Sequence, residues 1–303
     1  MNRRIYYREP VFRPPSEGRS LLIQATEGCT YRCSFCVSNL GKAFKIRKTE
    51  EIKQDLDTAR HLYRSVRRIF FLDGNAMVMP FKPLLEIIRY AHQIFPEIER
   101  VSCYAHGKDI IGKSDEELLT LRQAGLKMVY IGIETGDDAL LQKIGKRETQ
   151  DDIVHAFHKC FKAGITPSGT IILGLAGSDP NSSRNHAIQT AKLVNRANPK
   201  DYSDPEWFIA TLALMLPPGT PIFNEAQQGT FTPMNTDEIL GELKLLIENL
   251  SDDLRNCIFR SNHASNYLAL KGILSKDKKS ILKIIEQNMK DHRDVRPEFY
   301  RAL

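Results

Sequence analysis

The sequence contains no long hydrophobic run. Nowhere in its 303 residues do about 18 uncharged apolar residues follow one another, the length that a membrane-spanning helix needs. The basic first residues, MNRRIYYREPVFRPPSEGR, are not followed by the apolar stretch of a secretory signal peptide. We therefore expect a cytoplasmic protein without a transmembrane segment.

The sequence also lacks the extremes of composition that mark disordered or fibrous chains. Hydrophobic residues make up 42% and charged residues 26%, as in an ordinary globular protein that buries a substantial core. The formal net charge of +6 is spread along the chain and is not gathered in one basic tract. We therefore favour partners other than nucleic acid.

Cysteine is scarce, and half of it is concentrated in one short stretch. Of the six cysteines, Cys29, Cys33 and Cys36 fall within the sequence EGCTYRCSFC. In a reducing compartment, clustered cysteines are more often metal ligands or catalytic thiols than disulfides. The other three stand far apart in apolar surroundings and are expected to be small buried residues: Cys103, Cys160 and Cys257.

Six short apolar segments alternate with amphipathic segments in the first two thirds of the chain. We interpret the apolar segments as strands over 21–25, 68–72, 100–105, 127–133, 168–175 and 207–215. The segments between them have helical spacing, with Thr49 and Ser114 as expected N-cap residues. This alternation is typical of parallel βαβ units, so we predict an α/β fold and favour a single barrel.

Polar or glycine-rich loops follow four of the expected strands. The cysteines follow the first strand, residues 73–75 the second, Glu134 the fourth and residues 174–177 the fifth. The carboxyl ends of parallel strands meet at one edge of the sheet, where α/β proteins gather their chemistry. The sequence therefore predicts one site that is built from these four loops.

Three cysteines in one short loop suit two kinds of metal centre. A closed zinc site needs four protein ligands, and the nearest candidate, His61, lies on an expected helix face where it would be solvated. An iron–sulfur cubane held by three thiolates leaves its fourth iron open to a small molecule. We favour Cys29, Cys33 and Cys36 as ligands of a [4Fe-4S] cluster and keep zinc as the alternative.

The cysteine motif, with the aromatic Phe35 directly before its last cysteine, resembles the signature of the radical S-adenosylmethionine (radical SAM) superfamily. The resemblance covers residues 18–220 and implies a partial (β/α)6 TIM-like barrel with a helical C-terminal extension. It implies two cofactors, a [4Fe-4S] cluster and S-adenosyl-L-methionine, which the reduced cluster cleaves to a 5′-deoxyadenosyl radical. It also implies that Phe35 contacts the cofactor.

The same resemblance assigns further residues to cofactor binding. Asp73, Gly74 and Asn75 stand where the family usually carries Gly-Gly-Glu, so backbone carbonyls would hold the cofactor's amine, with Asn75 as a weaker acceptor. Glu134 matches the strand-four position that meets the ribose or carboxyl end of the cofactor. Gly174 belongs to a strand-five motif that resembles the one beside the adenine.

We expect three parts along the chain. They are an N-terminal arm (1–18), a core barrel (19–222) and a C-terminal extension (223–303) that covers the open side of the barrel. Within the extension, the stretch FRSNHASNYLALKG looks too polar for a core. It is interpreted either as a substrate-facing element or as a hydrogen-bonded loop that packs against the barrel.

The resemblance does not select one reaction, because a shared fold supports many chemistries. No second cysteine cluster is visible, which argues against members with auxiliary clusters. The chain is similar to single-cluster iron–sulfur oxidoreductases, although it lacks the extra cysteine of anaerobic coproporphyrinogen oxidases. We expect a small-molecule or lipid-like substrate and an electron donor such as flavodoxin or ferredoxin. The alternative is a zinc or iron–sulfur binding module that recognises a protein or nucleic acid.

Overall fold

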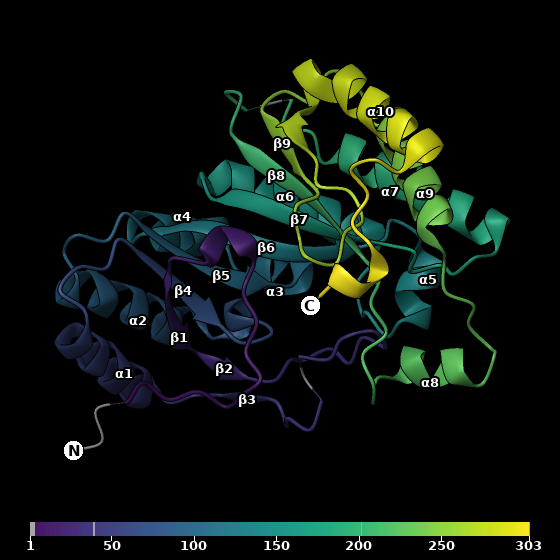
Figure 1. Ribbon diagram of the computed structural model, residues 1–303. Coiled ribbons are helices and arrows are strands. Elements are labelled where there is room, and N and C mark those ends of the chain that lie inside the picture. The colour runs from purple at the N-terminus through teal and green to yellow at the C-terminus, as the bar shows by residue number, and fades with distance from the viewer. Residues whose placement is uncertain (1–3, 39, 201, 303) are drawn as a thin grey trace. The chain divides into compact units, whose positions relative to one another are not determined.

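The computed structural model describes residues 4–38, 40–200 and 202–302 (Figure 1). The chain divides into two compact units, each of which is described by itself. Unit 1 comprises Met1–Arg32, Ser38–Ile131 and Lys159–Pro167, and unit 2 comprises Cys33–Val37, Gly132–His158 and Ser168–Leu303.

Unit 1 is built on parallel strands in the order β1-β4-β5-β6. The strands are β1 (Leu21–Gln24), β4 (Arg68–Leu72), β5 (Arg100–Ala105) and β6 (Leu126–Glu134), and residues 132–134 of β6 belong to unit 2. Apolar residues fill the middle of this sheet; Ile69, Phe70 and Phe71 of β4 are completely buried. Burial on both faces explains why these strands are recognisable as continuous apolar runs.

The remaining elements of unit 1 are helices and short strands that follow or precede the sheet strands. They are η1 (Pro15–Glu17), β2 (Thr26–Glu27), β3 (Lys45–Ile46), α1 (Thr49–Leu62), η2 (Ala76–Val78), α2 (Phe81–Ile94), α3 (Gly107–Ile111) and α4 (Asp115–Gln123). Helix α2 buries Leu84, Ile87, Ile88 and Ala91, which recur at helical spacing along one face.

Two helix caps were predicted for unit 1, and one prediction was wrong. Ser114 caps α4: its hydroxyl accepts from the Glu117 N–H at 3.1 Å, and the Glu117 carboxylate accepts from the Ser114 N–H at 3.0 Å. Thr49 is instead the first helical residue of α1. Lys48 occupies the N-cap position without a side-chain hydrogen bond, because the extended backbone ends one residue earlier than expected.

Unit 2 contains a second group of strands in the order β7-β8-β9-β10. They are β7 (Thr166–Leu173), whose first two residues belong to unit 1, β8 (Trp207–Ala213), β9 (Cys257–Arg260) and β10 (Lys271–Ile273). Strands β7, β8 and β9 are parallel, and β10 is antiparallel to β9. All six core strands predicted from the sequence are present, whereas β9 and β10 were not predicted.

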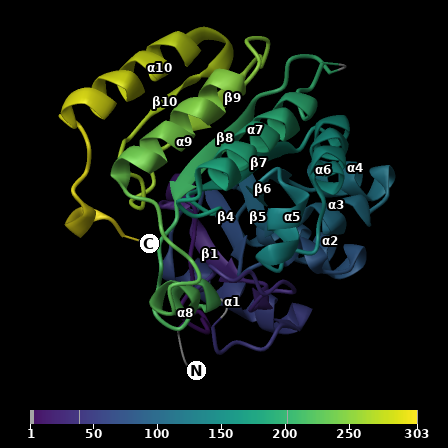
Figure 2. The same cartoon turned by 90° about the vertical axis from the view of Figure 1, so that its right-hand side faces the viewer.

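Helices cover one face of the unit 2 strands. The helical elements are α5 (Asp138–Lys143), α6 (Gln150–Ala163, continuing into unit 1), α7 (Pro180–Arg196), α8 (Pro221–Gln227), α9 (Thr236–Asn249), α10 (Leu274–Asp291) and η3 (Glu298–Tyr300). Both views show α9 lying beside α7 and α10 (Figures 1 and 2). Helix α9 buries Leu240, Leu243 and Ile247.

The polar stretch after β9 is largely buried, contrary to the expectation that it is too polar for a core. Ser261, Ser265 and Asn266 are 1%, 1% and 3% exposed. Each of the three side chains has a hydrogen-bond partner. The Ser261 hydroxyl donates to Leu268 O at 3.1 Å, the Asn266 amide donates to Thr211 O at 2.7 Å, and the Ser265 hydroxyl lies 2.9 Å from His263 Nδ1. Polar side chains are buried readily when they are hydrogen-bonded in this way. The stretch is therefore a packed loop of unit 2.

The isolated cysteines and the absence of a long apolar helix agree with the sequence for the residues that the structure describes. Cys103, Cys160 and Cys257 are completely buried, as predicted, and burial raises the pKa of each thiol. Among the described helices, none combines the length and the apolar surface that crossing a membrane requires. The cytoplasmic location and the three-part division of the chain stay predictions.

Candidate functional site

The loop that carries the cysteines is closed at its base by a small antiparallel ribbon in unit 1. Strand β2 pairs with β3, with Thr26 opposite Ile46. Gly28 follows β2 with φ +68°, and a Cβ at this position would lie 3.3 Å from the carbonyl oxygen of Ala43. Glycine is therefore suited to this turn, which delivers Cys29 directly after it.

Cys29 is 93% buried in unit 1, and nitrogen atoms surround its sulfur. The Tyr31 N–H donates to the Cys29 Sγ at 3.4 Å, and His106 Nε2 lies 3.4 Å from the same sulfur. Hydrogen bonds to cysteine sulfur are one means by which proteins tune iron–sulfur clusters. The surroundings of Cys29 therefore fit a thiolate ligand.

Cys33 and Cys36 belong to unit 2, where the backbone around them is fixed. The Cys36 N–H donates to the Cys33 carbonyl at 3.0 Å, which forms a tight turn. Ser34 between them donates its N–H to Ile144 O at 2.8 Å and accepts from the Ile222 N–H at 3.1 Å. The structure thus describes the two halves of the motif in separate units, and the ligand assignment stays a prediction.

Phe35 packs against an apolar cluster of unit 2. The buried members of this cluster are Leu140, Ile144, Ile172 and Leu175. This packing gives Phe35 a structural reason to be apolar. The expected contact with the cofactor stays a prediction.

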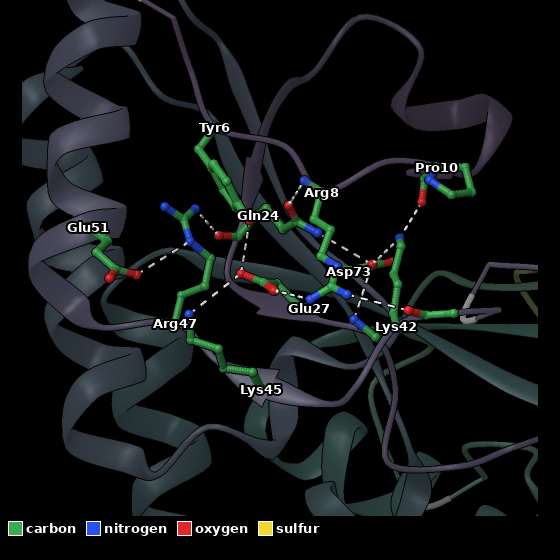
Figure 3. A network of polar contacts seen from close by, with 12 residues as sticks. Tyr6, Arg8, Pro10, Gln24, Glu27, Lys42, Lys45, Arg47, Glu51 and Asp73 are labelled. Atoms are coloured by element: carbon green, nitrogen blue, oxygen red, sulfur yellow. Dashed lines mark hydrogen bonds and ion pairs between the residues drawn. The ribbon is translucent and has the colours of Figure 1, made fainter. Parts of the chain in front are cut away.

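Asp73, after β4, is buried in a polar network of unit 1 (Figure 3). Its Oδ2 is 2.8 Å from the Lys42 ammonium and accepts, at 3.4 Å, from both the Gly28 N–H and the Gln24 side-chain amide. Burial raises the pKa of Asp73, and Lys42 and the N–H groups of Gly28 and Gly74 oppose this shift. The Asp73 carboxylate therefore contacts both Gly28 and Lys42, which lie before and after the cysteines in the sequence.

The N-terminal arm extends this network (Figure 3). The Arg8 N–H donates to the Gln24 Oε1 at 2.7 Å, and the Arg8 guanidinium donates to Glu27 at 3.2 Å and to Gly41 O at 3.3 Å. The Lys42 ammonium also donates to the carbonyl of Pro10. The arm is therefore hydrogen-bonded to both sides of the loop base.

Replacing Arg8 with alanine tests how much the arm stabilises the loop base. We expect Arg8→Ala to lower the free energy of unfolding by about 1–2 kcal/mol, because the buried Glu27 loses one charged donor. Urea denaturation measures this loss. Arg67→Ala is the matched control, since Arg67 pairs with Glu99 on the surface, and it should change stability by less than about 0.5 kcal/mol. Equal losses in the two variants would contradict the bracing role.

Asn75 is completely buried and has one unsatisfied oxygen. Its Nδ2 donates to His106 Nδ1 at 3.2 Å and to the Asp109 carboxylate. Its Oδ1 has no hydrogen-bond partner among the described residues. A buried acceptor without a protein partner can accept from a bound group, so this oxygen is compatible with the predicted weak acceptor for the amine of a cofactor.

Glu134 ends β6 in an unusual backbone conformation, with φ +60°. Its carboxylate lies 3.5 Å from the Lys146 ammonium, which is 3.4 Å from Glu148. Gly132 makes room for it, because a Cβ at 132 would stand 1.9 Å from the Glu134 Oε1. The pKa of Glu134 is raised by burial and by Glu148, with Lys146 opposing. Although burial lowers the pKa of Lys146, the charges of Glu134, Glu148 and Cys33 raise it overall.

Gly174, after β7, makes a packing contact, which is the alternative to cofactor binding that a glycine in this position also allows. Its φ is +79°, and a Cβ there would lie 2.6 Å from the Cδ1 of Ile239 on α9. Its N–H donates at 2.7 Å to Glu242, a buried carboxylate that also accepts from Ser183 at 2.6 Å and lies 3.5 Å from His186. These contacts give Gly174 a structural reason to be glycine. Its contact with a cofactor stays a prediction.

Sequence reasoning missed several buried charged residues, among them Lys42, Lys146 and Glu242. Each pairs with a group far along the chain or in another loop, so no local pattern marks it. In the part of the chain that the structure describes, no group of three or more His, Cys, Asp or Glu side chains is arranged to hold a metal ion. The cluster assignment therefore depends on the cysteine motif and on the proteins to which this chain is similar.

Residues 23–186 match the profile of the Radical SAM superfamily, which is more than half of the chain. The chain belongs to this superfamily. This match confirms the resemblance that the cysteine motif showed. It also confirms the predicted enzyme class, the radical SAM enzymes.

Individual relatives are distant and longer. The chain is 26% identical over 178 residues to "Uncharacterized methyltransferase PH0819" of Pyrococcus horikoshii, covering 58% of this chain and 36% of that protein. It is 26% identical over 185 residues to "Probable GTP 3′,8-cyclase" of Archaeoglobus fulgidus, covering 60% and 57%. These two relatives thus have different reactions in their names, and this chain spans less than two thirds of the length of either.

Solved structures confirm the predicted fold class. The coproporphyrinogen III oxidase HemN of Escherichia coli, a radical SAM enzyme, superposes with a TM-score of 0.55 at 15% identity, over 76% of this chain and 51% of that one. The methyltransferase TsrM of Kitasatospora setae, solved with tryptophan and a SAM analogue, superposes at 0.53 and 21% identity, over 73% and 43%. The fold is thus an α/β partial TIM-like barrel with a helical C-terminal region.

Proposed function

We propose that this protein is a radical SAM enzyme that binds a [4Fe-4S] cluster through Cys29, Cys33 and Cys36. The observation that carries the proposal is the three-cysteine motif inside the region that matches the superfamily. When bound and reduced, the cluster supplies the electron that splits S-adenosylmethionine into methionine and a 5′-deoxyadenosyl radical, which abstracts a hydrogen atom from a substrate.

The chain's own residues have binding roles in this proposal. The buried Cys29 provides one thiolate, and the unpartnered Oδ1 of Asn75 accepts a hydrogen bond from the cofactor's amine, together with backbone carbonyls of Asp73 and Gly74. Glu134, at the end of β6, meets the ribose or carboxyl end of the cofactor. The substrate is a small or lipid-like molecule, and a flavodoxin or ferredoxin provides the electron.

Anaerobic turnover tests the proposed function. The protein is reconstituted with iron and sulfide, reduced with dithionite and mixed with S-adenosylmethionine, and 5′-deoxyadenosine is measured by mass spectrometry. Its formation supports radical initiation. A purified protein that contains zinc and forms no 5′-deoxyadenosine would instead support a binding module for a protein or nucleic acid.

Replacing Glu134 with glutamine tests its place in cofactor binding. We expect Glu134→Gln to raise the dissociation constant for S-adenosylmethionine roughly 10- to 100-fold, because hydrogen bonds to a charged acceptor are the stronger ones. Iron content should not change. Anaerobic equilibrium dialysis with labelled cofactor measures the dissociation constant.

Glu148→Gln is the matched control for this prediction. Glu148 is the second carboxylate beside Lys146 and is fully buried, so the variant disturbs the same ion-pair network without removing Glu134. We expect it to bind S-adenosylmethionine like the unchanged protein. Equal weakening in the two variants would assign the effect to the network, and unchanged binding in Glu134→Gln would dismiss the role.

A further inference from the structure

His106 connects two residues that the proposed function uses. It follows β5, occupies the N-cap position of α3 and is 7% exposed. One face of its ring stacks on Tyr31, with ring centroids 3.9 Å apart and planes inclined by 10°. The stacking fixes the plane of the imidazole, so its two nitrogen atoms have defined neighbours: Nε2 faces the Cys29 sulfur, and Nδ1 faces the Asn75 amide and the Thr30 hydroxyl.

The neighbours of Nδ1 determine where the ring carries its proton. The side-chain nitrogen of Asn75 can only donate, and its orientation is set by the Asp109 carboxylate, which accepts from the same Nδ2. Nδ1 of His106 therefore accepts from Asn75 at 3.2 Å, and the Thr30 hydroxyl, 3.3 Å from the same nitrogen, is compatible with this because it can act as a second donor. The distance from Nδ1 to Asp109 is 3.8 Å, too long for a hydrogen bond.

A neutral imidazole that accepts at Nδ1 carries its hydrogen on Nε2. In this tautomer the Nε2–H is directed at the Cys29 Sγ, 3.4 Å away. The sulfur thus receives an N–H from the His106 ring as well as the Tyr31 backbone N–H at 3.4 Å. The ring hydrogen bond is the one that a side-chain substitution removes.

We propose that His106 is a positioning residue that donates a hydrogen bond to Cys29 and thereby raises the reduction potential of the cluster. This inference rests on the proposed function, because it takes Cys29 as a cluster ligand. Donation to a ligand sulfur withdraws electron density from it, which stabilises the reduced cluster more than the oxidised one. The cluster then accepts the electron for cofactor cleavage more readily. Asn75 sets the tautomer on which this depends.

The first test compares His106→Phe with His106→Gln in the reconstituted protein. Phenylalanine keeps the stacking on Tyr31 and loses the donor, whereas the Nε2–H of glutamine retains a donor at a similar distance from the backbone. We expect His106→Phe to lower the midpoint potential enough to decrease the ratio of reduced to oxidised cluster about tenfold at a fixed applied potential, or about 59 mV for one electron. His106→Gln should stay near the unchanged protein. A redox titration followed by electron paramagnetic resonance gives both values.

A purely structural role for His106 predicts a different pattern. It would lower the unfolding stability of both variants and leave the potential of the remaining intact cluster unchanged. Tyr31→Phe serves as the control, since it keeps the stacked ring and the backbone N–H, and its potential should not move. A wild-type potential in His106→Phe, or equal shifts in the Phe and Gln variants, would overturn the inference.

A second measurement needs no cluster and separates this inference from the proposed function. Nitrogen-15 NMR of the protein without metal reports the tautomer of His106, for which we expect the hydrogen on Nε2 and a non-protonated Nδ1. A hydrogen on Nδ1 would overturn the inference, whatever the cluster does. If the chain assembles no cluster and forms no 5′-deoxyadenosine, the proposed function fails instead. A cluster that works with a potential indifferent to His106 refutes only the role of His106.

Discussion

Cys33→Ala is expected to abolish cluster binding and to reduce the yield of 5′-deoxyadenosine by more than about 100-fold. Replacing a residue that only hydrogen-bonds to a metal ligand already lowers metal affinity or activity by about 10- to 100-fold, and loss of a ligand should have a larger effect. The motif supplies three thiolates, and one of the four irons has no protein ligand from the start. Loss of one thiolate would therefore leave two irons without a ligand from the protein. Iron and sulfide analysis after reconstitution measures the cluster directly. Cys29→Ala and Cys36→Ala are expected to behave in the same way.

The control for this prediction is a cysteine outside the motif in the same unit as Cys33. Cys257 is completely buried in β9, and burial raises the pKa of its thiol, so it is a small core residue rather than a ligand. Cys257→Ala should retain the iron and sulfide of the unchanged protein. Circular dichroism should show a folded chain in all variants. Full iron content in any motif variant would refute the assignment of that cysteine.

The strands of the core were predictable because each is buried along most of its length. β4 and β5 have the bounds that the apolar segments predict, and Ile69 to Leu72 are completely buried. Where both faces of a strand are covered, hydrophobic residues must follow one another, and the sequence shows this directly. The short β9 and β10 were missed because their few residues alternate in burial or are partly exposed beside a polar loop.

The motif residues of the site were predictable, but the residues that hold them were not. The spacing of the three cysteines is local, so it is visible in ten residues of sequence. By contrast, Lys42 meets Asp73 across 31 positions, and the Gly174 N–H meets Glu242 across 68. Buried charges of this kind depend on which loops the fold brings together. Neither periodicity nor composition records that arrangement.

The same distinction applies to Gly174 and Asp73. Sequence resemblance placed both beside a bound cofactor, and the structure gives each a contact within the protein: Ile239 against Gly174, and Lys42 with Asp73. A residue can occupy a motif position because it supports the site without contacting the ligand. For Asp73, the carboxylate contacts Lys42 and Gly28 beside the cysteines, whereas the predicted amine contact would use its backbone carbonyl.

Lys146→Met is expected to lower the free energy of unfolding by about 3–5 kcal/mol, the usual loss when one partner of a buried ion pair is removed. The Lys146 side chain is 2% exposed and lies between Glu134 and Glu148, whose side chains are 12% and 0% exposed. Methionine fills a similar volume but leaves both carboxylates without their cation. Urea denaturation at pH 7.5 measures the loss. Lys192→Met, on the exposed face of α7, should change stability by less than about 0.5 kcal/mol.

The pH dependence of this variant distinguishes a charge effect from a packing effect. Burial already raises the pKa of Glu134, and Lys146 opposes that shift, so the variant should raise it further. A carboxyl group whose pKa is higher in the folded than in the unfolded protein binds more protons in the folded state. The free energy of unfolding therefore decreases as the pH rises from the ordinary pKa of glutamate toward the raised pKa. We therefore expect the loss in Lys146→Met to be clearly smaller at pH 5 than at pH 7.5. The double variant Lys146→Met/Glu134→Gln should recover part of the stability at pH 7.5, because it removes one of the unpaired charges. Two results together would contradict the charge effect: a loss of unfolding free energy that is equal at both pH values, and no recovery in the double variant. Lys146 would then stabilise the fold through packing alone and not through its attraction to the Glu134 carboxylate.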